Sequence, residues 1–102
     1  MQVTWENYVY QLFRDMDTPA RRRQKHIVLD LPADGRQIPP GRLPELSPRV
    51  ALGYAGRTPK TITRDLNELV KMRLIRRVRG GIVANRGLIR AFLPVVAQPD
   101  EL

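Results

Sequence analysis

The stretch that decides the fold is residues 58–72, which reads TPKTITRDLNELVKM. Thr58 and Pro59 are typical of a helix start, because threonine can cap the first turn and proline is preset for the first helical position. The apolar residues that follow recur at spacings of three and four, which predicts an amphipathic helix over residues 59–72. Its apolar side holds Ile62, Leu66, Leu69 and Val70, and its opposite side holds Lys60, Arg64, Asn67 and Lys71.

Another helix is predicted directly before this one. Ser47 and Pro48 repeat the cap-and-proline signal, and Gly56 allows a sharp turn after a short helix that ends near Ala55. Two helices joined by a tight glycine turn define a helix-turn-helix. The residues of the first helix that we expect to pack against the second are Val50, Leu52 and Tyr54.

A β-hairpin is predicted over residues 75–84, after the second helix. Two short β-prone runs flank Gly80 and Gly81, and glycines supply the positive φ values that a tight turn needs. This hairpin is the wing. The sequence therefore predicts a mainly α fold with a small β-hairpin (α+β), a winged helix-turn-helix preceded by an N-terminal helical extension.

The rest of the chain divides into segments around this unit. Residues 1–31 form the predicted extension, with helices over 4–17 and 19–29, and residues 32–46 form a proline-rich and glycine-rich connector whose only plausible strand is at Gln37 and Ile38. Residues 47–94 hold the winged helix-turn-helix, closed by a helix over 88–93 that stops at Pro94, and residues 95–102 are expected to be a flexible tail.

Two features of the extension leave alternatives open. The first helix carries an apolar stripe that is either core, a docking face or the seam of a dimer. It consists of Trp5, Tyr8, Val9, Leu12, Phe13 and Met16. The second helix carries the basic run 21–25, which is either a solvated face or a contact to phosphate.

Composition narrows the classes of function. The formal net charge is +8, and residues 57–90 alone hold ten Lys/Arg against two acids. A localised positive field favours a polyanionic partner. The chain has no cysteine and one histidine, His26, which is expected to be structural, so no metal site, cofactor or catalytic constellation is predicted and an enzyme is not expected. The absence of a long apolar run indicates no membrane span, and we expect a cytoplasmic protein.

The predicted second helix has the residue types that read DNA. Arg64 can grip guanine through two hydrogen bonds, threonines suit phosphate or a thymine methyl group, and wing arginines can reach the minor groove or the backbone. The expected DNA-binding residues are Arg57, Thr58, Lys60, Thr61, Thr63, Arg64, Asn67, Arg77 and Arg79.

Residues 58–69, together with residues 74–81, resemble the DNA-binding head of DeoR-type winged-helix repressors. The resemblance implies a three-helix winged fold and DNA binding by Thr61, Arg64 and the wing arginines. Arg73 stands where such proteins usually turn with glycine. Residues 81–94 also resemble, more loosely, the end of winged helices appended to Fic-type proteins, which implies an accessory domain; the chain has no His-Pro-Phe motif for nucleotidyl transfer.

The leading prediction is sequence-specific binding of double-stranded DNA by a transcriptional regulator, with helix 59–72 in the major groove and wing 75–84 on the backbone or minor groove. A homodimer is expected, because two-fold sites add affinity and specificity. Its predicted interface is the N-terminal helix, through Trp5, Tyr8, Leu12 and Phe13. The alternative is a protein-interaction or regulatory module; RNA binding is disfavoured, because exposed aromatic pairs for stacking bases are missing.

Overall fold

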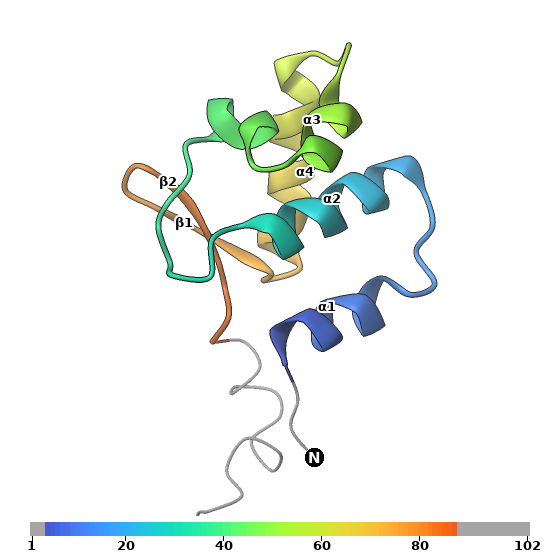
Figure 1. Cartoon of the computed structure of the whole chain (residues 1–102), viewed down its shortest axis with the longest axis vertical. Helices are drawn as coiled ribbons and strands as arrows, with labels where there is room; N and C mark the ends of the chain where they lie inside the picture. Colours follow the sequence, from blue (N-terminus) through green and yellow to red (C-terminus); the bar gives the residue numbers. More distant parts are fainter. Residues whose placement is uncertain (1–3, 88–102) are drawn as a thin grey trace, which may run out of the picture.

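A computed structural model describes residues 4–87, which form a mainly helical fold with one two-stranded antiparallel sheet (Figure 1). The elements are α1 (Trp5–Phe13), α2 (Pro19–Asp30), the 3-10 helix η1 (Pro40–Glu45), α3 (Pro48–Tyr54), α4 (Pro59–Lys71), β1 (Ile75–Val78) and β2 (Gly81–Ala84). This is the predicted winged helix-turn-helix with helices before it. The helix predicted over residues 88–93 and the tail over 95–102 lie outside the described residues.

The helix starts follow the sequence signals, with one exception. The hydroxyls of Thr4, Thr18 and Ser47 each accept a backbone N–H from the first turn of the helix that follows. Thr58 has the extended backbone of a cap residue before Pro59, but its side chain makes no capping hydrogen bond. The prediction of the helix start was therefore right, while the prediction that the Thr58 hydroxyl caps the helix was wrong.

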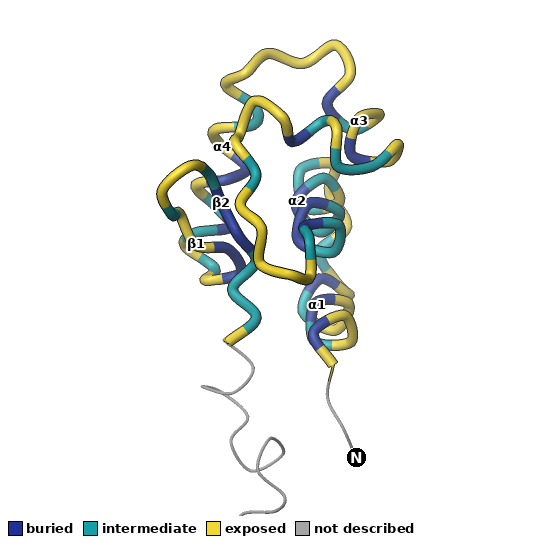
Figure 2. The backbone as a smooth tube through the Cα atoms, turned by 60° about the vertical axis from the view of Figure 1, so that its left-hand side comes forward, coloured by how far each residue is buried: buried dark blue, intermediate teal, exposed yellow. Residues whose placement is uncertain are grey.

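The core lies where α2, α3 and α4 meet. In Figure 1, α2 crosses the molecule between α1 on one side and α3 and α4 on the other, and Figure 2 shows that each of these helices has buried positions. The fully buried residues from the three helices include Ile27, Val28, Val50, Leu66 and Leu69. The core therefore includes residues from both sides of positions 31 and 46. The predicted domain boundaries at these positions stay predictions.

Leu52 does not pack in this core. Its side chain is 77% exposed, whereas Val50 and Tyr54 are buried as expected. The spacing explains the difference, since successive residues of a helix are about 100° apart and Leu52 lies two residues from both buried neighbours, on the opposite side of α3. The prediction that Leu52 packs against α4 was wrong.

Helix α1 uses its apolar stripe inside the monomer. Trp5, Val9 and Phe13 are buried, and Tyr8 and Leu12 are partly buried against the same core. The helix ends at Phe13, four residues earlier than predicted. Of the alternatives for this stripe the structure therefore favours core, so Trp5 and Phe13 are not exposed to a second copy; homodimerisation itself stays a prediction.

One isolated β-bridge joins the connector to the wing. β1 and β2 pair antiparallel with Arg77 opposite Ile82, and Ile38 exchanges two 3.0 Å backbone hydrogen bonds with Ile82. Ile38 is the predicted strand position of the connector, present as one bridge. Gly81 makes the approach possible, because a Cβ there would lie 2.3 Å from the Ile38 carbonyl oxygen.

Helix α4 ends in a Schellman motif that orients the wing. The N–H of Leu74 bonds to the Leu69 carbonyl and the N–H of Arg73 to the Val70 carbonyl, both at 3.0 Å. This motif needs a left-handed residue after the helix, and Arg73 has φ 63°. The Asn85 amide holds the carbonyl of Arg73 at 2.8 Å, so the junction between α4 and β1 is fixed from both sides.

Candidate nucleic-acid interface

The outer side of α4 is a polar, cationic surface. Its exposed residues are Lys60, Thr63, Arg64, Asn67 and Lys71, and Thr61 is half-buried beside them. Within residues 4–87, neither Lys60 nor Arg64 has a carboxylate within ion-pair distance. Both cations are therefore available to an external anion.

The inner side of α4 is fixed by a buried carboxylate. Asp65 is 1% exposed and accepts hydrogen bonds from three side chains on the two neighbouring helices. The donors are Arg23 Nε at 2.8 Å, Gln24 Nε2 at 3.0 Å and Tyr54 Oη at 2.6 Å. Because these donors come from α2 and α3, one side chain connects all three helices and sets how α4 is presented.

The electrostatics of this cluster agree with its geometry. Burial acts to raise the pKa of Asp65, but the hydrogen bonds from Arg23, Tyr54 and Gln24 outweigh it and hold the pKa below its ordinary value. Burial, reinforced by the hydrogen bond to the carboxylate, raises the pKa of Tyr54. At neutral pH the cluster is therefore an ionised carboxylate held by a guanidinium, a phenol and an amide.

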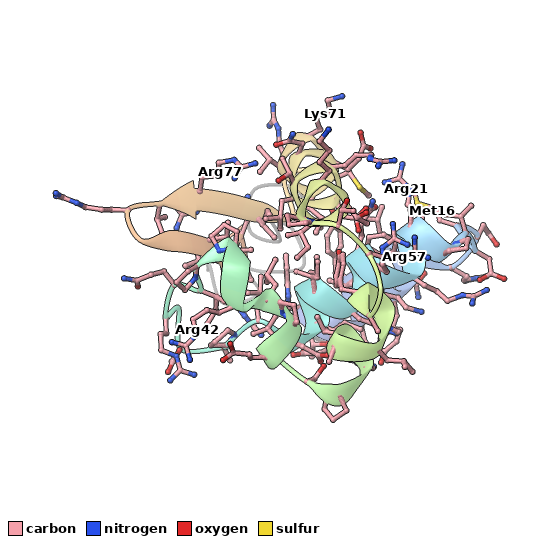
Figure 3. All side chains as sticks on the ribbon, turned by 90° about the horizontal axis from the view of Figure 1, so that it is seen from above. Met16, Arg21, Arg42, Arg57, Lys71 and Arg77 are labelled. Atoms are coloured by element: carbon pink, nitrogen blue, oxygen red, sulfur yellow. The ribbon has the colours of Figure 1, made fainter. Side chains whose placement is uncertain are left out.

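The wing contacts α4 through one side-chain pair. Arg77 on β1 donates from Nη2 to Oδ1 of Asn67 on α4. Figure 3 shows Arg77 and Lys71 on the same side of the molecule, from the wing and from α4. Two predicted DNA-binding residues are thus bonded to each other, and the pair makes the helix and the wing one continuous surface.

The remaining predicted site residues lie at the two ends of this surface. Arg57 is exposed in the turn between α3 and α4, where its Nε donates to the Gly53 carbonyl at 3.2 Å. Thr58 is exposed at the start of α4, and Arg79 is exposed in the turn of the wing. The structure therefore gathers the predicted residues along α4, its leading turn and the hairpin.

The basic run on α2 has a role that neither prediction described. Arg23 is largely buried against Asp65, Arg21 lies 3.5 Å from Glu68 of α4, and Arg22 is exposed and paired with Asp17. Helical spacing carried a signal for this, because Arg23 and Gln24 stand four residues before the buried Ile27 and Val28. Asp65 likewise falls on the apolar side of α4.

Three basic residues outside the predicted set are also exposed close to this surface. Lys71, Arg73 and Arg76 are exposed on α4, the junction and β1, and Arg73 and Arg76 have no acidic partner among residues 4–87. Clustering of arginines between residues 73 and 79 was the signal that pointed to Arg73 and Arg76, and helical spacing was the signal for Lys71.

Comparison with known families agrees with this geometry. Residues 51–87, from within α3 to the last residue that the structure describes, match the DeoR-like helix-turn-helix domain. This segment is a DeoR-type helix-turn-helix head. Searches of curated proteins and of solved structures gave no significant match.

The family match defines the class of function. A DeoR-like helix-turn-helix is a DNA-binding module rather than a catalytic one, and its partner is double-stranded DNA. DNA binding in transcriptional regulation is therefore the function class of this head. No helix among residues 4–87 has the length and apolar character needed to span a membrane.

Proposed function

We propose that the protein binds double-stranded DNA sequence-specifically as a transcriptional regulator, with α4 in the major groove and the wing on the backbone or minor groove. The observation that carries this proposal is the uncompensated cationic side of α4, where Lys60 and Arg64 have no acidic partner within residues 4–87. The buried Asp65 cluster supports it, because a reading helix needs a fixed orientation.

The roles along α4 follow from side-chain chemistry. Arg64 is the residue for base readout, because a planar guanidinium can donate two hydrogen bonds to guanine. Lys60, Thr61, Thr63 and the unused hydroxyl of Thr58 suit phosphates and thymine methyl groups. Asn67 keeps its amide donor for a base or phosphate while its oxygen accepts from Arg77.

The wing and the turn before α4 supply the flanking contacts. Arg77 is already oriented toward α4 by Asn67, and Arg79 extends from the hairpin turn. Arg57 stands at the other end of α4, where a cation suits the neighbouring phosphates. These contacts position the helix without reading sequence.

Fluorescence anisotropy with random duplex DNA at about 50 to 300 mM salt tests the proposal. Each neutralised phosphate contributes a slope of about −0.9 in the logarithm of affinity against the logarithm of salt concentration. We expect a steep slope that flattens by about two when Arg77 and Arg79 both become alanine. Arg42→Ala is the matched control for lost charge, because Arg42 pairs with Glu45 and Figure 3 shows it on the side of the molecule away from Lys71.

Absent binding, or binding that responds to Arg42→Ala as much as to the wing changes, would contradict the proposal. The protein-interaction module, including an accessory role beside a Fic-type protein, would then be the better account.

We also infer that two copies bind one site, because a single recognition helix reads few base pairs. Since Trp5 and Phe13 are internal, the contact falls to other residues, such as Tyr10 on α1, which is 51% exposed. Sedimentation of the protein with and without duplex DNA tests this inference: a 2:1 complex supports it, and a 1:1 complex at saturation contradicts it.

A further inference from the structure

Both acids of α4 are held by arginines of α2. Asp65 lies 2.8 Å from Arg23, and Glu68 lies 3.5 Å from Arg21. They are the only acidic residues in the basic segment 57–90. The positive field of α4 and the wing therefore depends on cations that belong to another helix.

Glu68 has a competing partner on its own helix. It stands four residues after Arg64, a spacing at which oppositely charged side chains on a helix attract each other. Its carboxylate nevertheless pairs with Arg21 and, at 3.6 Å, with Lys71, while Arg64 has no acidic partner within residues 4–87. The ion pair of Glu68 with Lys71 is the weaker of the two, because the Lys71 side chain is 77% exposed.

Arg21 is held in place for this task. Its Nη1 donates to Gln24 Oε1 at 2.8 Å and lies 3.2 Å from the sulfur of Met72. Gln24 in turn donates to Asp65, so the guanidinium is tied to the buried cluster. Figure 3 shows Arg21 and the wing residue Arg77 on opposite sides of α4.

We propose that Arg21 is a positioning residue for DNA binding: it holds the Glu68 carboxylate away from Arg64, so that the Arg64 guanidinium stays free for the nucleic acid. This inference rests on the proposed DNA binding of α4. Arg21 itself touches no DNA in this account. Its effect on affinity passes entirely through Glu68.

A double-mutant cycle with Arg21→Gln and Glu68→Gln tests the proposal, because glutamine keeps much of each side chain's length while removing its charge. Anisotropy with random duplex DNA at constant salt gives the affinities. We expect Arg21→Gln to weaken binding about threefold to fivefold, since Glu68 then competes for Arg64 and repels phosphate. In the Glu68→Gln background, the same change is expected to cost almost nothing.

Arg22→Gln is the matched control. Arg22 is the next residue of the same basic run, but it pairs with Asp17 and makes no ion pair to α4. The affinity of Arg22→Gln measures how much the loss of one positive charge at this place on α2 weakens the long-range attraction to DNA. Thermal melting of every variant confirms that the folded state is being compared.

A second readout does not depend on DNA. In the free protein, the Nε–Hε resonance of Arg64 is expected to shift when Arg21 becomes glutamine and to return when Glu68 is also changed. If the wild type does not bind DNA but this shift is present, the proposed function is removed while the effect of the Arg21–Glu68 pair on Arg64 still stands. The inference is overturned if Arg21→Gln costs the same factor in both Glu68 backgrounds, if Arg22→Gln costs as much, or if the Arg64 resonance does not move.

Discussion

The phenolic hydroxyl of Tyr54 donates a 2.6 Å hydrogen bond to the carboxylate of Asp65. It joins the last residue of α3 to the middle of α4, across the turn of the helix-turn-helix. The same carboxylate holds Arg23, whose guanidinium lies over the Tyr54 ring at 5.6 Å. The relative orientation of the two helices is thus fixed by a buried charge.

Loss of this carboxylate is expected to be strongly destabilising. Asp65→Ala leaves Arg23 without its counterion in a largely buried position, which costs about 3–5 kcal/mol in the free energy of unfolding. Tyr54→Phe removes one hydrogen bond to a charged group, which costs about 2 kcal/mol. Urea unfolding measures both. Arg42→Ala breaks an exposed ion pair and is expected to cost about 0.5 kcal/mol or less; equal losses at Asp65 and Arg42 would refute the role of the cluster.

Acid is expected to weaken the fold through Asp65 and Asp30. Burial acts to raise each pKa, but hydrogen bonds, from Arg23 to Asp65 and from Arg49 to Asp30, outweigh it and lower both values. A lowered folded-state pKa means that the stabilisation is complete above the unfolded value of about 3.9 and is lost as the pH falls through the folded values. The urea concentration at the midpoint of unfolding should therefore decrease at pH values below about 4. This decrease should be smaller in Asp65→Asn.

His26 adds an earlier, smaller loss of stability. Burial, then the charges of Arg49 and Lys25, lower its pKa below the ordinary value of 6.5. The folded state thus prefers the neutral imidazole, so stability is complete above about pH 6.5 and declines as the pH falls toward the folded pKa. His26→Gln is expected to remove this decline in the urea midpoint between neutrality and pH 5 while leaving the acid drop. If the urea midpoint of the variant depends on pH as in the wild type, another group causes the decline.

Arg73 is a position where glycine is expected to stabilise the protein. Its φ of 63° costs a residue with a Cβ about 1–2 kcal/mol, and glycine avoids this cost. The greater freedom of glycine in the unfolded chain offsets part of this gain in stability. Arg73→Gly should therefore raise the free energy of unfolding by about 0.5–1 kcal/mol. Arg73→Ala is the control, because it removes the guanidinium but keeps the Cβ; a gain as large for alanine would show that backbone strain is not the cause.

Local signals in the sequence predicted the helix starts and the wing well, because they act within a few residues. Proline after Thr18, Ser47 and Thr58 places three helices correctly, and the glycine pair marks the hairpin. The exposed side of α4 follows from the same helical spacing. These features need no knowledge of what lies far along the chain.

Long-range pairing was not predictable in the same way. Arg23 and Asp65 are 42 residues apart, and either residue alone resembles a solvated charge. Only the packing of α2 on α4 makes them a buried pair, and the same packing assigns Arg21 to Glu68. Leu52 was predicted to be buried and is exposed. The two turns of α3 give too little periodicity to tell its inner side from its outer side.

Base reading by Arg64 of α4 is tested by comparing the affinity for a specific sequence with the affinity for random DNA. Selection from random duplexes yields a preferred sequence, and the affinity for that sequence relative to random DNA is then compared between wild type and Arg64→Ala at one salt concentration. We expect an enriched sequence and a ratio that falls about tenfold to a hundredfold in the variant, the loss expected for one bidentate contact to a base. A ratio that Arg64→Ala leaves unchanged, or a wild-type selection that enriches nothing, would contradict it.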